Sequence, residues 1–94
     1  MIDGRVGVLV TTQHRGVFFG FADPLEVENK AKIKLTRIRN CISWSADVGG
    51  FLGLAKTGPN RSCRIGVEAL EAVLHDITSC TLCTEEAVAA WTSA

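Results

Sequence analysis

Two apolar segments joined by a short polar connection constrain the fold of this chain more than any other feature. Residues Val6 to Thr12 and Val17 to Ala22 are rich in β-branched and aromatic side chains, which favour strands. The residues between them, Gln13 to Gly16, have the polar, glycine-bearing character of a hairpin connection. The pattern therefore predicts a β-hairpin near the start of the chain.

The second strand of this hairpin is apolar on both faces. Successive side chains of a strand point to opposite sides, so Val17, Phe19 and Phe21 share one face. Phe18 lies on the other face, although a strand with one face in water would alternate apolar and polar residues. We therefore expect either a barrel that wraps around the hairpin or a second copy of the chain against its outer side, and we favour a homo-oligomer.

A strand with a break in its pattern follows the hairpin. Lys30, Lys32 and Lys34 alternate with apolar residues, which predicts an amphipathic strand whose lysines face solvent at an edge of the sheet. The alternation slips at residues 36–38. We therefore expect a bulge or corner there, before a further strand over residues 39–45.

The end of the chain is predicted to hold strands and then a helix. Residues 71–83 fit either a helix or two strands broken near Asp76, and their Val, Ile and Thr content favours strands. Thr84 is a suitable helix N-cap, and the two glutamates after it suit the positive end of the helix dipole. We expect a short helix up to Ala94 that docks through Val88 and Trp91, because it is too short to be stable alone.

Together these elements predict a mainly β fold: a small antiparallel β-barrel or meander of five to six strands with a short C-terminal α-helix. The 94 residues suffice for one core, so we expect a single β-rich domain over residues 1–94. No apolar run is long enough to span a bilayer, and Met1 to Arg5 lacks the pattern of a signal peptide. We therefore expect a cytoplasmic protein without membrane contact, whose four cysteines are buried, inert thiols.

The segment Gly50 to Thr57 (GFLGLAKT) differs by one residue from a nucleotide-binding P-loop. That motif requires a glycine where this chain has Ala55, and it requires a helix that continues past the lysine. Gly58 and Pro59 would stop such a helix. We therefore reject an NTPase and expect an exposed glycine-rich loop, whose backbone N–H groups can approach an anion closely.

A cationic cluster around that loop is the candidate binding site. Residues 30–64 hold eight Lys or Arg and a single acidic residue, Asp47, although the formal net charge of the chain is zero. Arginine binds phosphate through paired hydrogen bonds, and tryptophan offers a face for stacking. The alternatives are an ordinary solvated loop and a plain core position for the tryptophan. The predicted ligand-binding residues are Arg39, Trp44, Lys56, Asn60, Arg61 and Arg64.

No catalytic or metal-binding motif accompanies this cluster in the sequence. The segment Cys80 to Cys83 has the spacing of a ligand pair, but Cys41 and Cys63 occur singly and not as the second pair of a zinc site. His75 and Asp76 are adjacent, which places them on opposite faces of a strand. We expect no enzyme activity, no metal and no cofactor.

Several segments match one family of proteins, in order along nearly the whole chain. They are Val10 to Gly20, Arg39 to Trp44, Gly50 to Ala55 with Gly58 and Pro59, Cys63 to Gly66, Leu74 to Thr78 and Cys83 to Ala87. In this ordered set the chain resembles a family of small uncharacterised proteins of bacteriophages and prophages. The resemblance implies no activity and no residue role. It implies a counter-defence purpose, which small phage proteins without enzyme motifs often have.

We therefore expect a phage-encoded homo-oligomer that sequesters a phosphorylated small molecule or nucleotide signal at a subunit boundary, without catalysis, in the host cytoplasm. The alternative is a protein-interaction module that inhibits a host defence complex or serves as a virion accessory part. A weaker alternative is binding of single-stranded nucleic acid through the lysines of residues 30–34 and the aromatic side chains.

Overall fold

The predicted hairpin lies at the centre of the fold. The computed structural model describes residues 4–13, 16–27, 31–44 and 49–94. Strands β1 (Val6–Thr12) and β2 (Val17–Ala22) pair antiparallel, with the bounds that the sequence predicts. The elements after them are the 3-10 helix η1 (Pro24–Glu26), β3 (Lys32–Ser43), α1 (Gly50–Lys56), β4 (Arg64–Ile65), β5 (Ala69–His75), β6 (Ile77–Leu82) and α2 (Glu85–Ser93).

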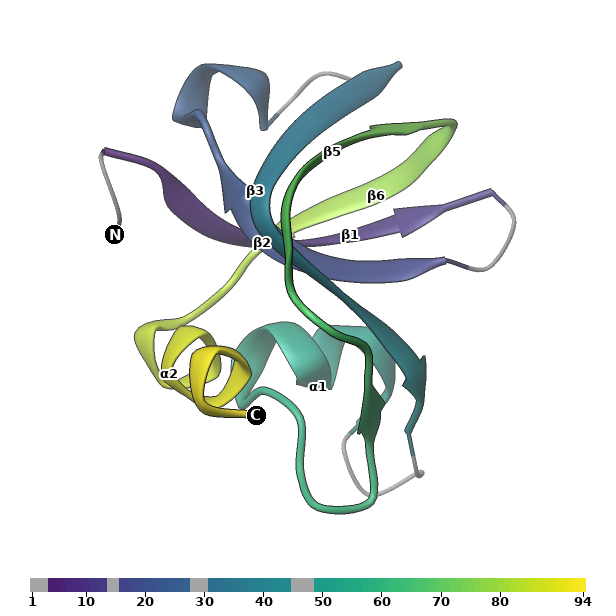
Figure 1. Cartoon of the computed structure of the whole chain (residues 1–94), viewed down its shortest axis with the longest axis vertical. Helices are drawn as coiled ribbons and strands as arrows, with labels where there is room; N and C mark the ends of the chain where they lie inside the picture. The colour runs from purple at the N-terminus through teal and green to yellow at the C-terminus, as the bar shows by residue number, and fades with distance from the viewer. Residues whose placement is uncertain (1–3, 14–15, 28–30, 45–48) are drawn as a thin grey trace.

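The strands form an open six-stranded antiparallel sheet (Figure 1). Its order is β4-β3-β2-β1-β6, and β5 pairs with the first half of β3. In the described part of the chain β5 and β6 do not pair with each other, so the sheet is not closed. The prediction of a mainly β fold with a C-terminal helix is thus confirmed, but a barrel is not supported.

Strand β3 bends where the alternation of the sequence slips. Arg37 has a left-handed φ of 51°, and the pairing register between β3 and β2 shifts at this point. The predicted bulge is therefore confirmed, although one bent strand replaces the two strands expected. Lys32 and Lys34 are exposed, as the amphipathic pattern predicts, while Lys30 lies outside the described residues. At Lys32 and Lys34 β3 pairs with β5, and its pairing with β2 begins only at Thr36, so the edge position of the lysines stays a prediction.

A second corner joins the last two strands. Asp76 has a φ of 54°, and it separates β5 from β6. Aspartate adopts this left-handed conformation more readily than most residues because its short polar side chain can bond locally. The strands predicted over residues 71–83, with a break near Asp76, are confirmed.

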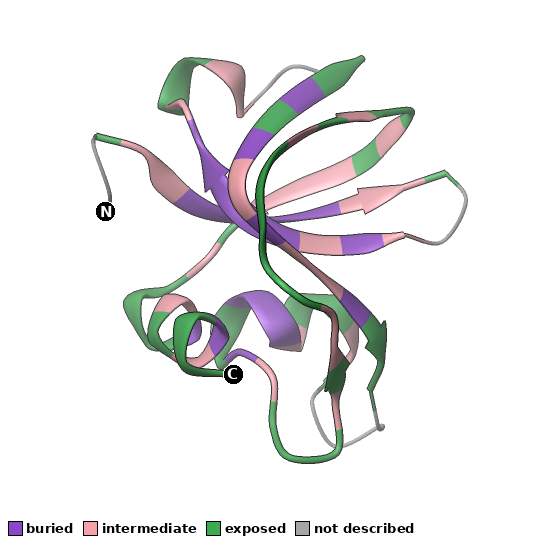
Figure 2. Cartoon of the chain, in the orientation of Figure 1, coloured by how far each residue is buried: buried purple, intermediate pink, exposed green. Residues whose placement is uncertain are grey.

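Apolar side chains on the two faces of the hairpin fill two cores. Figure 2 shows buried stretches along both strands of the hairpin. The first lies between the sheet and the helices and contains Leu9, Val17, Phe19, Phe21, Cys41, Leu54, Ala55, Ala87 and Trp91. The second lies on the opposite face, inside the curve of the sheet, and contains Val8, Val10, Ala22, Ile33, Leu35 and Ile38. The chain therefore covers both sides of its own hairpin.

This arrangement removes the reason for expecting a partner subunit on the hairpin. Phe18 is half-buried and packs against the second core, not against solvent. Its apolar character therefore follows from the fold of one chain. Self-association stays a prediction, but it needs a different surface.

The two helices lie side by side on the first face of the sheet (Figure 1). The exposed loop expected over Gly50 to Thr57 is wrong, because residues 50–56 form α1 and bury Leu54 and Ala55. Gly58 then ends the helix with a φ of 82°, and a Cβ there would lie only 2.5 Å from Ala90 Cβ of α2. Among the described residues, no helix is long and apolar enough to cross a membrane.

Helix α2 starts and docks as the sequence predicts. The Thr84 hydroxyl accepts a hydrogen bond from Ala87 N and donates one to Lys56 O, so it caps α2 and ties it to α1. Trp91 is fully buried, and its ring stacks on Phe19 with centroids 5.2 Å apart and an angle of 2°. Its indole N–H donates to Leu54 O over 3.1 Å. The predicted docking through Trp91 is confirmed.

We predict that Trp91→Ala lowers the free energy of unfolding by about 3–5 kcal/mol, because it removes a large buried ring and leaves a cavity. Trp44→Ala serves as the matched control, since Trp44 is 37% exposed. It is expected to cost less than about 1 kcal/mol. Urea unfolding of both variants measures the difference, and equal losses would contradict the central role of Trp91.

Candidate functional site

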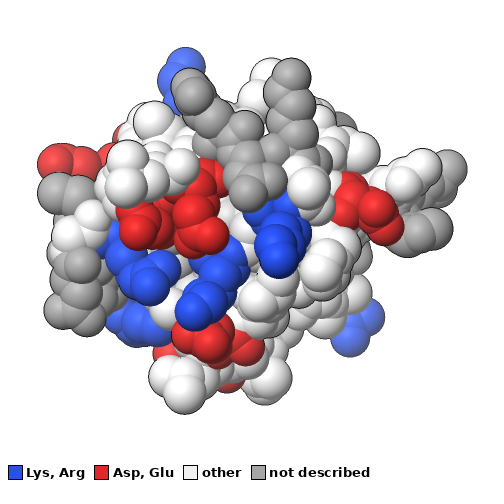
Figure 3. Space-filling model, turned by 90° about the horizontal axis from the view of Figure 1, so that it is seen from above, with Lys and Arg blue, Asp and Glu red and all other residues white. Residues whose placement is uncertain are grey.

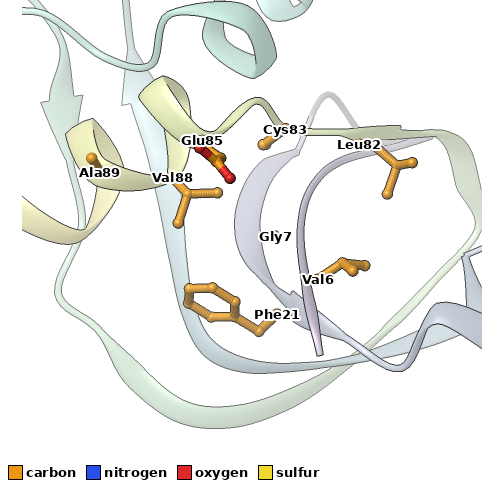
Figure 4. Close-up of a pocket in the computed structure, with 8 residues that line it drawn as sticks. All are labelled: Val6, Gly7, Phe21, Leu82, Cys83, Glu85, Val88 and Ala89. Atoms are coloured by element: carbon orange, nitrogen blue, oxygen red, sulfur yellow. The ribbon is translucent and has the colours of Figure 1, made fainter. Parts of the chain in front are cut away.

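A cleft lies between the start of α2 and the end of the sheet. Its volume is about 480 Å³, which is within the range of small-molecule sites. Figure 4 shows Phe21 and Val88 facing each other on one side of this hollow and Val6 and Leu82 on the other. The residues that line it, called the apolar cleft below, are Val6, Gly7, Phe21, Leu82, Cys83, Glu85, Val88 and Ala89.

Gly7 allows α2 to approach the sheet closely enough to form one wall of the cleft. A Cβ at this position would lie 2.6 Å from Val88 Cγ2, which is too short for a real contact. The backbone of Gly7 also holds the segment that leads into α2, because Cys83 N donates a hydrogen bond to Gly7 O over 3.0 Å just after β6 ends. A glycine inside a strand pattern is thus used for close approach of a second element.

The cleft carries one acidic side chain on otherwise apolar walls. Glu85, in the first turn of α2, points toward the hollow from its rim (Figure 4). Burial raises the pKa of the Cys83 thiol to about 12, and the nearby Cys80 thiol adds to this shift. Cys83 is therefore an uncharged thiol at neutral pH. The cleft accordingly favours a ligand that is apolar along its body and carries a hydrogen-bond donor or a positive charge.

A second hollow of about 450 Å³ adjoins the apolar cleft. Val6 and Leu82 line both hollows, so the two share a wall. Leu25 is 91% exposed at this second hollow, next to Pro24 and Val27. Apolar surface thus continues from α2 past the edge of the sheet to η1.

The predicted anion site is only partly assembled. Arg39 binds the end of α2, because its Nη1 donates hydrogen bonds to Trp91 O and Ala94 O over 3.1 and 2.6 Å. Its Nε donates a hydrogen bond to Gly66 O, in the segment between β4 and β5. A cation at this end of a helix is favoured by the helix dipole. The contacts therefore assign Arg39 a structural task in holding α2.

The other five predicted residues lie on α1, on β4, in the turn between them and just after β3. Arg64 is exposed on β4 and pairs with Ser43, so it shares a face with Ser43, whereas Trp44 follows with the opposite parity. Asn60 Oδ1 accepts hydrogen bonds from Ser62 within its own turn, and Arg61 is exposed in the same turn. Lys56 is exposed at the end of α1, next to the start of α2. Among the described contacts, none brings two of the six side chains together.

The cysteines do not form a cluster of metal ligands. In the part of the chain that the structure describes, no three His, Cys, Asp or Glu side chains gather in a way that could hold a metal ion. Cys41 is buried in the first core. Its pKa is raised to about 11, mainly by burial and to a smaller extent by the neighbouring Cys63. His14 lies outside the described residues, and His75 lies exposed at the end of β5.

The comparisons with known proteins give a family but no function. A model of a domain of unknown function, DUF6948, matches residues 5–91. The chain belongs to the DUF6948 family. Searches among curated proteins and among solved structures returned no match. The resemblance to bacteriophage proteins therefore stays a prediction, and the site has to be interpreted from its own chemistry.

Sequence reasoning missed the apolar cleft of this DUF6948 domain. The one available signal was Gly7, an isolated glycine in an otherwise β-branched strand, which indicates a close backbone approach. The cleft itself depends on how α2 is placed against β1 and β6. That placement is a tertiary property that no local pattern encodes.

We predict that Gly7→Ala lowers the free energy of unfolding by about 1–3 kcal/mol, because the added methyl group overlaps Val88. Val88→Ala makes room for that methyl group. The double variant should therefore lose less stability than the sum of the two single variants. Unfolding curves of all four proteins measure the coupling, and strictly additive losses would show that Gly7 does not set the position of α2.

We also predict a loss of stability at alkaline pH. Below about pH 9, the ordinary pKa of a thiol, Cys83 is protonated in both the folded and the unfolded chain and has no effect. As the pH rises from about 9 toward 12, the unfolded chain releases this proton while the folded chain retains it, which favours unfolding.

Thermal unfolding under reducing conditions at pH 8 and pH 10 tests this linkage. The midpoint of the wild-type protein should fall more between the two pH values than the midpoint of Cys83→Ala. An equal fall of the two unfolding midpoints would contradict a raised pKa of Cys83 in the folded protein.

Proposed function

We propose that the protein is a binding protein whose apolar cleft takes a small ligand with an apolar body and a cationic or hydrogen-bond-donating group. The ligand's apolar body would lie between Val88, Phe21 and Leu82, and its polar group would face Glu85. Binding would bury the exposed part of Leu82, which is 59% accessible in the free protein. The observation that carries this proposal is the 480 Å³ cleft with a single carboxylate at its rim.

The rigidity around the cleft supports binding without a large rearrangement. Phe21 is 1% exposed and forms the floor as part of the first core. Helix α2, which forms one wall, is held by the Thr84 cap, by Trp91 and by Arg39. A preformed cavity loses little conformational entropy when a ligand enters. The site therefore favours sequestration, in which affinity alone is needed.

A thermal-shift panel of matched ligands tests the proposal. We expect aromatic and alkyl amines to raise the unfolding midpoint in a concentration-dependent way, following RT ln(1 + [L]/Kd), and matched carboxylates to have less effect. Ala89→Trp should abolish the shift by filling the cleft. Ser93→Trp, on the same helix but outside the cleft, should retain it.

Glu85→Gln tests the charge of the rim. This substitution should weaken the binding of amines more than the binding of neutral ligands of the same shape. An unchanged shift in Ala89→Trp, or no shift with any apolar ligand, would overturn the cleft as the binding site.

A second candidate function is sequestration of a phosphorylated small molecule or nucleotide, at the corner formed by the turn of residues 60–63 and β4. The observation that favours it is that Arg61 and Arg64 are both exposed there, three residues apart. Nucleotides in the same panel distinguish the two sites. A shift abolished by Arg64→Ala and retained in Ala89→Trp would assign the ligand to this corner.

The two remaining alternatives find less support in the structure. Figure 3 shows Lys and Arg side chains intermixed with Asp and Glu on the face seen from above, and not a continuous cationic track. Binding of single-stranded nucleic acid would require such a track along the backbone of the strand. A protein partner, such as a host defence complex, stays a prediction that the exposed apolar surfaces allow.

A further inference from the structure

Strand β5 exposes more apolar surface than any other strand among the described residues. Leu70 is 86% exposed, Val73 is 45% exposed, and Val67 just before the strand is 88% exposed. Figure 2 shows β5 coloured largely as exposed. These side chains lie outside the apolar cleft and play no part in the proposed ligand site. Such a surface costs solvation free energy unless something covers it.

The backbone of β5 is also uncovered along one edge. β5 pairs with β3 from Lys32–His75 to Ile38–Ala69, and no strand in the described part of the chain pairs with its other side. Natural edge strands are commonly protected by charged side chains, proline or a bulge. The sequence of β5, Ala-Leu-Glu-Ala-Val-Leu-His, contains a single charged residue, Glu71, and no proline, and its register with β3 shows no shift. This edge is therefore open to strand addition.

The sequence of β5 is complementary to itself in the antiparallel direction. If two copies pair about Ala72, Leu70 of each lies opposite Leu74 of the other, and Glu71 lies opposite Val73. No two like charges face each other directly. Cross-strand pairs of large apolar residues are favourable, whereas like charges in opposite positions are not.

The same pairing would extend the second core across the two copies. Leu74 and Ala72 are half-buried and pack at the rim of that core, opposite Ile33 and Leu35 of β3. Leu70 has the same parity as these two residues and therefore projects toward the same side of the sheet. In a pair of chains, the exposed Leu70 of one copy would cover the rim of the second core of the other copy.

We propose that the open edge of β5 is a self-association surface, at which two copies of this chain pair β5 to β5, antiparallel about Ala72. The result is a two-fold dimer with one continuous sheet, because a self-complementary patch closes after two copies. The zero formal net charge of the chain opposes this association only weakly.

Molar mass in solution, measured by light scattering and sedimentation over a concentration series, tests the surface. The wild-type protein is expected to be a dimer. Leu70→Lys should raise the dimer dissociation constant at least about tenfold, because it places a charge in the centre of the apolar contact. Leu25→Lys is the matched control, since Leu25 is 91% exposed at a distant element, and it should leave the mass unchanged.

Disulfide trapping tests the register independently. Ala72→Cys lies opposite its own copy and should give a covalent dimer under a mild oxidant, identified by the linked peptide in mass spectrometry. Ala69→Cys is the control, because its two copies would lie about 20 Å apart in this register.

The possible outcomes decide for or against the surface. A monomeric wild-type protein, or a dimer whose mass Leu70→Lys leaves unchanged, would overturn it. A dimer that is dissociated by Leu70→Lys but trapped equally at both positions would support the strand and refute the register about Ala72.

Discussion

The fold depends on the burial of Trp91 against Phe19. The indole ring joins the last helix to the central hairpin by stacking, and its N–H satisfies a carbonyl of α1, so one side chain fixes three elements. Arg39 reinforces the same junction from β3, because its guanidinium holds the carbonyl of Trp91 itself. The wall of the apolar cleft is therefore positioned in part by residues that do not line the cleft, namely Trp91 and Arg39.

Local patterns predicted much of the backbone correctly. Alternation and turn chemistry located both strands of the hairpin, the slip in alternation located the bend at Arg37, and a hydroxyl followed by two glutamates located the start of α2. Each of these signals acts between residues close in sequence. The double-sided apolar strand was also interpreted correctly as covered on both faces. The elements that cover these faces were not predicted correctly. The sequence does not say whether β3 and the helices or a second chain cover them.

The errors share a physical origin in tertiary context. Glycines at positions 50 and 53 lowered the apparent helix propensity of α1, yet Leu54 and Ala55 gain enough burial against the sheet and α2 to hold the helix. Arg39 had the chemistry of a phosphate ligand, but the nearest acceptors in the fold are carbonyls at the end of α2. Of the candidate site, the sequence predicted exposed cations at Arg61 and Arg64, while the cleft beside α2 was not predicted.

The junction between Phe19 and Trp91 has a consequence for how the chain is made. Its two halves come from opposite ends of the sequence, so a growing polypeptide exposes the aromatic hairpin long before the residue that shields it has been synthesised. Contacts between distant segments also form slowly, because the intervening loop must close first. During synthesis the apolar face of the hairpin is therefore exposed to solvent until α2 has been made and has packed against it.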